Sequence, residues 1–171
     1  VTVIGSAGTN SFNLNIDRAG YYYRGDWTMD LKGGNDALNS AKLKDGDSID
    51  MGAGDDSVSV MLTGSNGTPS LGSANITKLD GGAGTDTLSF EESSPTAGTT
   101  LSLTTANATN FENLTGGSNA ETLNGDSNAN ILRGNNGADT LNGNGGNDTL
   151  YATSGNADED SANDNLYGGS G

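Results

Sequence analysis

The chain has 171 residues, of which 31% are hydrophobic, and its 22 acidic residues outnumber seven basic ones for a net charge of −15. This balance argues against a large apolar core and against nucleic-acid binding, and no apolar stretch is long enough to span a membrane. Without cysteine or histidine, disulfides, zinc sites built from those residues and the usual nucleophile–base pairs are excluded, whereas oxygen ligands for Ca²⁺ remain.

The first 28 residues lack the repeat. Val1 to Ile4 is rich in β-branched residues, and Ser11 to Asp17 alternates as a half-buried strand would. We expect region 1–28 to form a cap or irregular strands. Arg24-Gly25-Asp26 matches an integrin-recognised tripeptide, for which chance is the favoured explanation. The Tyr21 to Trp27 aromatic cluster is expected to cover an open end, with binding of cell-surface glycans as the alternative.

Glycine–aspartate turns recur at irregular spacing between residues 29 and 106, where we expect an irregular calcium-binding β-solenoid. The blocks are Leu31–Asn39 (LKGGNDALN), Met51–Ser59 (MGAGDDSVS), Gly81–Ser89 (GGAGTDTLS) and the weaker Lys42–Asp50 (KLKDGDSID). Three of them follow an apolar–Asp pair that ends in Asp30, Asp50 or Asp80, which adds a carboxylate at the mouth of each turn.

Longer strands and one acidic pair interrupt this region. Val58 to Thr63 and Thr99 to Thr105 predict longer strands beside insertions. Glu91-Glu92 is interpreted as a solvated acidic turn and not as a catalytic pair, because adjacent residues of a strand point to opposite faces. No catalytic constellation is found, and we expect that the chain is not an enzyme.

A strict nine-residue period predicts a regular narrow roll over residues 107–171. From Gly116 to Tyr151 the blocks read GGSNAETLN, GDSNANILR, GNNGADTLN and GNGGNDTLY, and Asn107 to Thr115 keeps the register. The eighth position of every block is leucine, and the sixth is acidic or asparagine. Ala152 to Glu159 is an insertion, and Asp158-Glu159-Asp160 is either a solvated loop or an extra calcium loop.

Each block combines a turn with a short strand. The first six residues tolerate positive φ and let carbonyl oxygens converge on an ion, and the last three place one apolar side chain inward. Two blocks therefore make one coil, and a cation between successive turns can take a carboxylate from each. A charge at the second position, such as Asp126, is expected to face solvent.

The register predicts two edges of position-six residues. One edge should hold Asp36, Asp56, Thr77, Pro95, Glu112, Asn130 and Asp148; the other should hold Asp47, Ser65, Asp86, Thr104, Glu121, Asp139 and Asp164. The favoured sites pair neighbours along one edge: Asp36 with Asp56, Asn130 with Asp148, and Asp139 with both Glu121 and Asp164. In this arrangement Asp86 has a suitable loop but poor partners.

The pattern resembles the repeats-in-toxin family of hemolysin-type calcium-binding repeats, because Gly81–Ser89 matches G-G-x-G-x-D-x-apolar-x at every fixed position. The resemblance implies an all-β, right-handed parallel β-roll or β-solenoid with calcium-binding turns, exported by type I secretion. Glu112, Glu121 and Asn130 depart from aspartate, which predicts weaker or empty sites. The candidate calcium ligands are Asp30, Gly34, Asp36, Asp47, Asp50, Gly54, Asp56, Asp80, Gly82, Gly84, Asp86, Glu112, Glu121, Asn130, Gly137, Asp139, Gly146, Asp148 and Asp164.

The function expected from these observations is a calcium-dependent folding and structural module of a secreted bacterial surface protein or adhesin. Such a module is unfolded in low calcium and folds on export, with several Ca²⁺ ions bound. The alternative is the carboxyl-terminal repeat module of a secreted enzyme such as a protease, lipase or alginate epimerase. Expected partners are calcium and, as candidates, other domains of a larger secreted protein or cell-surface glycans.

Overall fold

The protein is a parallel β-roll built from three sheets. The computed structural model describes residues 2–13, 26–41, 43, 46–62, 77–92, 99–104, 107–153 and 163–171. All elements named in these residues are β-strands, and each pair of neighbouring strands within a sheet runs parallel. This arrangement confirms the fold class expected from the sequence.

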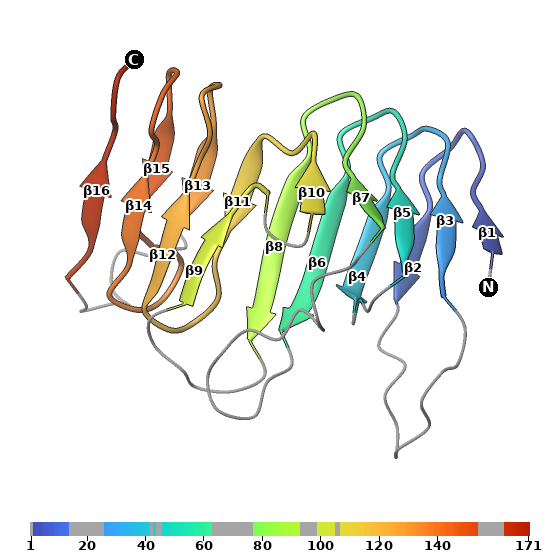
Figure 1. Cartoon of the computed structure of the whole chain (residues 1–171), viewed down its shortest axis with the longest axis horizontal. Helices are drawn as coiled ribbons and strands as arrows, with labels where there is room; N and C mark the ends of the chain where they lie inside the picture. The colour runs from blue at the N-terminus through green and yellow to red at the C-terminus, as the bar shows by residue number, and fades with distance from the viewer. Residues whose placement is uncertain are drawn as a thin grey trace.

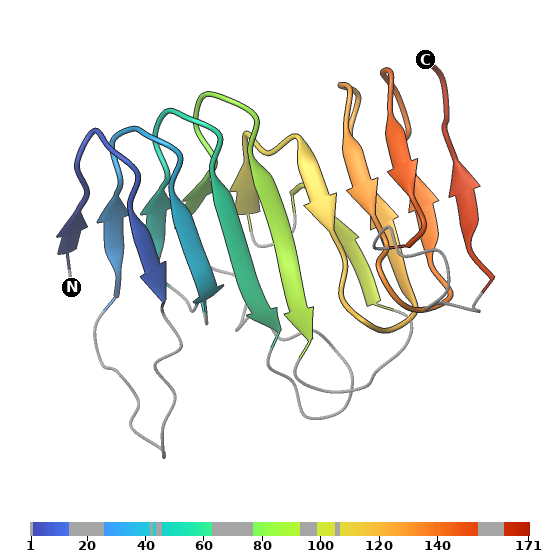
Figure 2. The same ribbon diagram turned by 180° about the vertical axis from the view of Figure 1, so that it is seen from behind.

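One long sheet, the common wall, runs through most of the roll and faces a different sheet in each half (Figures 1 and 2). The common wall contains β2 (Ser11–Asn13), β4 (Ala37–Ala41), β6 (Ser57–Leu62), β8 (Thr87–Glu92), β11 (Asn113–Thr115), β13 (Ile131–Arg133) and β15 (Thr149–Tyr151).

The two opposite walls divide the roll between them. The N-terminal wall contains β1 (Thr2–Ile4), β3 (Thr28–Asp30), β5 (Ser48–Asp50), β7 (Lys78–Asp80) and β10 (Ala108–Thr109). The C-terminal wall contains β9 (Thr99–Ser102), β12 (Glu121–Asn124), β14 (Thr140–Asn142) and β16 (Asn165–Tyr167). The opposite wall changes from one sheet to the other between β8 and β11. Here β9 pairs with β12 of the C-terminal wall, whereas β10 pairs with β7 of the N-terminal wall.

A thin core lies between the walls; most strands place one apolar side chain in it, whereas β6 and β8 each place two, Val58 with Val60 and Leu88 with Phe90. Leu38, Val58, Leu88, Leu114 and Leu132 form the column of the common wall, and all are fully buried. Burying one such side chain contributes about 1.5–3 kcal/mol, but the glycine-rich turns lose much conformational entropy on folding. The core is therefore small relative to the length of backbone that it must order.

Turns join the walls at two edges, and the upper edge in Figure 1 is the more regular. We call upper turns the segments that enter the common wall: residues 5–10, 31–36, 51–56, 81–86, 110–112, 125–130 and 143–148. The lower edge leaves the common wall, and its described parts include 46–47, 116–120, 134–139, 152–153 and 163–164.

Several predictions concern segments outside the described residues. These include Leu14 to Asp17, Tyr21 to Gly25, Ser65, Pro95 and the run Asp158-Glu159-Asp160. Glu91 and Glu92 lie in β8 and not in a turn, and the Glu91 side chain is exposed and accepts a hydrogen bond from Ser59. No helix that could cross a bilayer occurs in the described ranges. The boundaries predicted at residues 28 and 106 stay predictions.

Candidate metal-binding edges

Position-six side chains of the upper turns form a ladder along the roll. The backbone N–H of Asp36 donates to Oδ1 of Asp56 at 2.7 Å, and the N–H of Asp56 donates to Oδ1 of Asp86 at 2.7 Å. The N–H of Asp86 in turn donates to Oε2 of Glu112 at 2.8 Å. Each carboxylate thus reaches the preceding coil through one oxygen, which fixes the direction of its second oxygen.

The second oxygens of these aspartates are buried acceptors without a hydrogen-bond partner. This is the case for Oδ2 of Asp36, Asp56, Asp86 and Asp148, all on the upper edge. The residues Asp36, Asp56 and Asp86 are themselves at most 2% exposed. Because a buried, unpaired carboxylate oxygen is strongly unfavourable, this row needs partners beyond the chain's own donors, namely protons, bound cations or water.

Backbone carbonyl oxygens lie beside the carboxylates because glycine allows successive turns to approach closely. Gly54 and Gly84 have φ of 142° and 148°, and a Cβ on them would lie 2.3 and 1.9 Å from the carbonyl oxygens of Gly34 and Gly54. Gly34, Gly82, Gly137 and Gly146 also have positive φ. The turns therefore stack with their carbonyl groups in a row, as the sequence predicted for glycine at these positions.

Desolvation dominates the electrostatics of the row. Burial raises the pKa of Asp86 to about 6, and the neighbouring charges of Asp56, Glu112 and Asp55 act in the same direction, whereas the hydrogen bond from the Asp56 backbone opposes them. Burial also raises the pKa of Asp56, against the hydrogen bond from the Asp36 backbone. The protein itself thus stabilises the Asp56 and Asp86 carboxylates poorly as anions.

The lower edge has a shorter ladder of the same kind. The N–H of Glu121 donates to Oδ1 of Asp139 at 2.8 Å, and the N–H of Asp139 donates to Oδ1 of Asp164 at 2.8 Å. Nearer the N-terminus, the Trp27 N–H donates to Oδ1 of the fully buried Asp47 at 2.9 Å. Aspartates at position six therefore link neighbouring coils on both edges.

Departures from aspartate change how a turn is satisfied. Glu121 folds back so that Oε1 and Oε2 accept the backbone N–H groups of Asn119 and Gly117, both at 3.2 Å. Asn130 uses both ends of its amide: Oδ1 accepts the Asp126 N–H at 2.8 Å and Nδ2 donates to the carbonyl of Glu112 at 3.2 Å. In these two turns the position-six side chain uses more of its hydrogen-bonding groups within the protein than in the aspartate turns.

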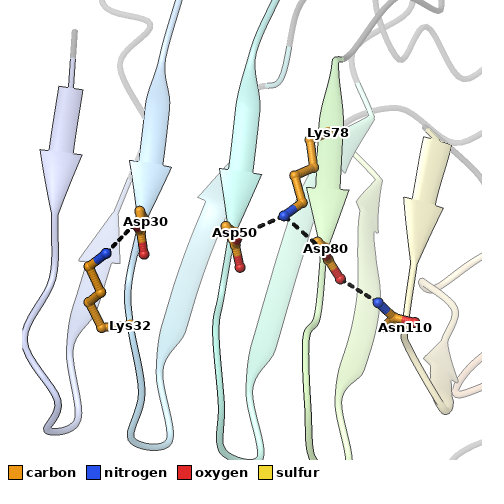
Figure 3. A network of polar contacts seen from close by, with 6 residues as sticks. All are labelled: Asp30, Lys32, Asp50, Lys78, Asp80 and Asn110. Carbon is orange, nitrogen blue, oxygen red and sulfur yellow. Dashed lines mark hydrogen bonds and ion pairs between the residues drawn. The ribbon is translucent and has the colours of Figure 1, made fainter.

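Asp30, Asp50 and Asp80 form a separate row on the N-terminal wall, in register with one another (Figure 3). Lys78 bridges Asp50 and Asp80 at 2.6 and 3.0 Å, and Lys32 pairs with Asp30. The hydrogen bond from Lys32 lowers the pKa of Asp30. Two lysines thus offset two of the three negative charges of this row, and its predicted role in binding calcium stays a prediction.

At Asp80 the hydrogen bonds together lower the carboxylate pKa by more than desolvation raises it. Burial by itself would raise the pKa of Asp80, but hydrogen bonds from Asn110 and Lys78 lower it overall (Figure 3). The hydrogen bonds to Asp50 and Asp80 raise the pKa of Lys78. This balance differs from that of Asp86, where desolvation prevails.

Most of the predicted neighbours along the edges are neighbours in the structure. Asp36 lies next to Asp56, Asn130 next to Asp148, and Asp139 between Glu121 and Asp164.

The predicted edge of Asp86 is wrong. Asp86 lies on the upper edge between Asp56 and Glu112, whereas Thr77 lies on the lower edge, where its N–H donates to the carbonyl of Asp47. The interval of 30 residues between Asp56 and Asp86, which includes insertion 63–76, hid this register. The apolar–Asp pairs that end in Asp50 and Asp80 carried the missing signal. They end two equivalent, neighbouring strands, so the turns that follow them must lie on the same edge.

An additional upper turn was missed at the N-terminus. Gly5 to Asn13 reads GSAGTNSFN, with glycine at the first and fourth positions, asparagine at the sixth and phenylalanine at the eighth. This turn stacks on the next one, because the Asn10 N–H donates to Oδ1 of Asp36 at 2.5 Å. A nine-residue template that accepted asparagine at position six would have found it.

The donor set fits a calcium ion better than a smaller or softer metal. No three acidic side chains converge anywhere in the described part of the chain, so two carboxylates and several carbonyl oxygens are what an upper turn offers. Ca²⁺ accepts six to eight oxygen ligands in flexible geometry, whereas Mg²⁺ demands a near-ideal octahedron and keeps its waters. The unpaired Oδ2 atoms would supply the anionic ligands.

Comparison with known proteins agrees with this chemistry. The family model described as RTX calcium-binding nonapeptide repeat (4 copies) matches residues 78–92, 115–150 and 124–157. No curated protein and no solved structure gave a significant match. Repeats of this family bind calcium, and the matched residues contain Asp86, Asp139 and Asp148. Residues 78–92 and 115–157 therefore carry RTX calcium-binding nonapeptide repeats, the family that the sequence resembles.

Proposed function

We propose that this chain is a calcium-dependent folding and structural module of a secreted bacterial surface protein or adhesin. The observation that supports the proposal most strongly is the upper-edge row of buried Oδ2 atoms on Asp36, Asp56, Asp86 and Asp148. In low calcium these carboxylates oppose folding, and in the higher calcium outside the cell they bind ions and hold successive coils together.

Electrostatic magnitudes favour a switch over a merely stabilised fold. Charges on adjacent coils are separated by about one strand spacing, ~4.8 Å, which gives a repulsion of about 3.5 kcal/mol at an effective dielectric constant of 20. Asp36, Asp56 and Asp86 include two such neighbouring pairs. Because typical domains have a net stability of only about 5–15 kcal/mol, unneutralised repulsion of this size decides whether the roll folds.

A circular-dichroism titration of the whole chain tests the proposal. We expect little β-structure in excess chelator, a cooperative gain on adding Ca²⁺ in the range of about 10⁻⁴ to 10⁻³ M, and poor substitution by Mg²⁺. The same folded spectrum in excess chelator, with no bound calcium by equilibrium dialysis, would refute the calcium switch.

The cellular role is the second part of the proposal. A folded roll that forms only after export suits a segment of a surface protein, since an unfolded acidic chain can be threaded out of the cell. We propose that the module itself has no enzymatic activity, because the sequence lacks histidine and cysteine. Detection of the parent protein only in the cytosolic fraction of producing cells would contradict the assignment to a secreted protein.

A further inference from the structure

Asn10 satisfies the first upper turn in a way that no aspartate can. Its Nδ2 lies 2.5 Å from the carbonyl oxygen of Gly8, 3.2 Å from that of Ser6 and 2.9 Å from Oδ1 of Asp36, so its two N–H groups are shared among three acceptors. One amide nitrogen thus gathers two carbonyl oxygens of its own turn and a carboxylate oxygen of the next. An aspartate at this position would add another acceptor and no donor.

The orientation of the amide follows from the chemistry of its neighbours. Oδ1 of Asn10 faces the Ser6 backbone N–H at 3.4 Å and the Ser6 hydroxyl at 3.2 Å, both of which can donate. The carbonyl groups of Ser6 and Gly8 can only accept, so Nδ2 must be on their side. Reversing the amide would place oxygen against oxygen and nitrogen against a donor.

The aspartate turns lack such a donor. Carbonyl oxygens at the same turn positions, such as those of Gly34 and Gly54, lie close to the next coil, and the Oδ2 atoms of Asp56 and Asp86 have no hydrogen-bond partner. A second asparagine repeats the substitution inside the roll, where Nδ2 of Asn130 donates to the carbonyl of Glu112. Neither Asn10 nor Asn130 is among the residues with a buried, unpartnered side-chain atom.

We propose that the Asn10 amide takes the place of a calcium ion in the first upper turn. The turn closes without metal, and the row of calcium sites on this edge begins at Asp36. This inference rests on the proposed calcium-dependent function.

The substitution Asn10→Asp tests this role by replacing the donor with a carboxylate. We expect the variant to bind one more Ca²⁺ per chain than the wild type, measured by equilibrium dialysis at saturating calcium. Its first coil should depend more steeply on calcium, which limited proteolysis with mass-spectrometric detection of cleavage before residue 26 can follow. The matched control is Asn39→Asp, which adds the same charge to an exposed site on β4, and its ion count should equal that of the wild type.

Asn10→Ala distinguishes a side chain that replaces a calcium ion from one that is a ligand of the ion. If the amide replaces an ion, this variant keeps the wild-type ion count and its first turn becomes more sensitive to proteolysis at every calcium concentration. Loss of one ion in Asn10→Ala, or no additional ion in Asn10→Asp, would overturn the inference while leaving the proposed function intact. If the wild-type chain itself binds no calcium, the proposed function fails first.

Discussion

Asp56→Asn should stabilise the roll without calcium and destabilise it with calcium. Asp56 lies between Asp36 and Asp86, is 2% exposed, and has an unpaired Oδ2. Asparagine keeps an acceptor for the Asp36 N–H but removes the charge, and with it two neighbouring repulsions of about 3.5 kcal/mol each at a dielectric constant of 20. Protonation of the wild-type row reduces the measured gain to a few kcal/mol.

In calcium the same change weakens two sites, because Asp56 faces the coils on both sides. An ion with a dissociation constant of about 10⁻⁴ to 10⁻³ M stabilises the fold by about 1.4–2.7 kcal/mol at 10 mM calcium. Loss of two ions therefore costs about 3–5 kcal/mol under these conditions. The free energy of unfolding of the variant should cross that of the wild type as calcium increases.

Urea titrations at a series of calcium concentrations, followed by circular dichroism, measure this crossing. The matched control is Asp55→Asn at the adjacent position, whose exposed side chain accepts the Thr85 N–H at 2.9 Å. Asparagine can keep that bond, and the Asp55 charge has the smallest of the effects on Asp56 and Asp86, so the control should change the calcium dependence less than Asp56→Asn does. Equal destabilisation of Asp56→Asn in chelator and in calcium would refute the reasoning, since it would mean that only packing had been lost.

Two further predictions concern pH and the lower edge. Because the folded-state pKa of Asp86 is raised to about 6, the calcium-free fold gains stability as pH falls from about 6 towards 4, and this contribution is lost again as pH rises through 6. With calcium present, protons should compete and raise the calcium midpoint below pH 6; a pH-independent midpoint would contradict this. Asp139→Ala removes the acceptor of the Glu121 N–H and a carboxylate next to Asp164, so it should raise the calcium midpoint and expose the chain after residue 151 to proteolysis. Asp126→Ala should change the midpoint less, although it loses two bonds from Asn128, and a larger effect than that of Asp139→Ala would refute the register.

Asp126 is only partly exposed to solvent, although we expected it to face solvent. Its Oδ1 accepts the Asn128 N–H at 2.7 Å and its Oδ2 accepts from the Asn128 side chain at 3.0 Å. A carboxylate at the second position thus braces its own turn. The first of these bonds is a local Asx turn to a backbone N–H two residues on, and the nine-residue register did not include it because the consensus has glycine at this position.

The sequence alone determined the fold class, the repeat and the chemistry of the turns. A leucine every nine residues, as at Leu123, Leu132 and Leu141, permits one inward contact per strand and hence a narrow parallel roll. Glycine with aspartate at fixed spacing in a histidine-free, cysteine-free chain restricted the metal to one that prefers oxygen. These conclusions needed only local geometry and composition.

Only the tertiary structure decided which coils are neighbours. Insertions of different length can be placed at either edge without changing any local pattern, so Asp86 was put on the wrong edge, and its position became clear through its bond from Asp56. The change of wall at β9 and β10 likewise arises from long-range pairing with β12 and β7. The role of Asn10 was hidden for the same reason: its amide meets the acceptors of two coils, and they are brought together only when the coils stack.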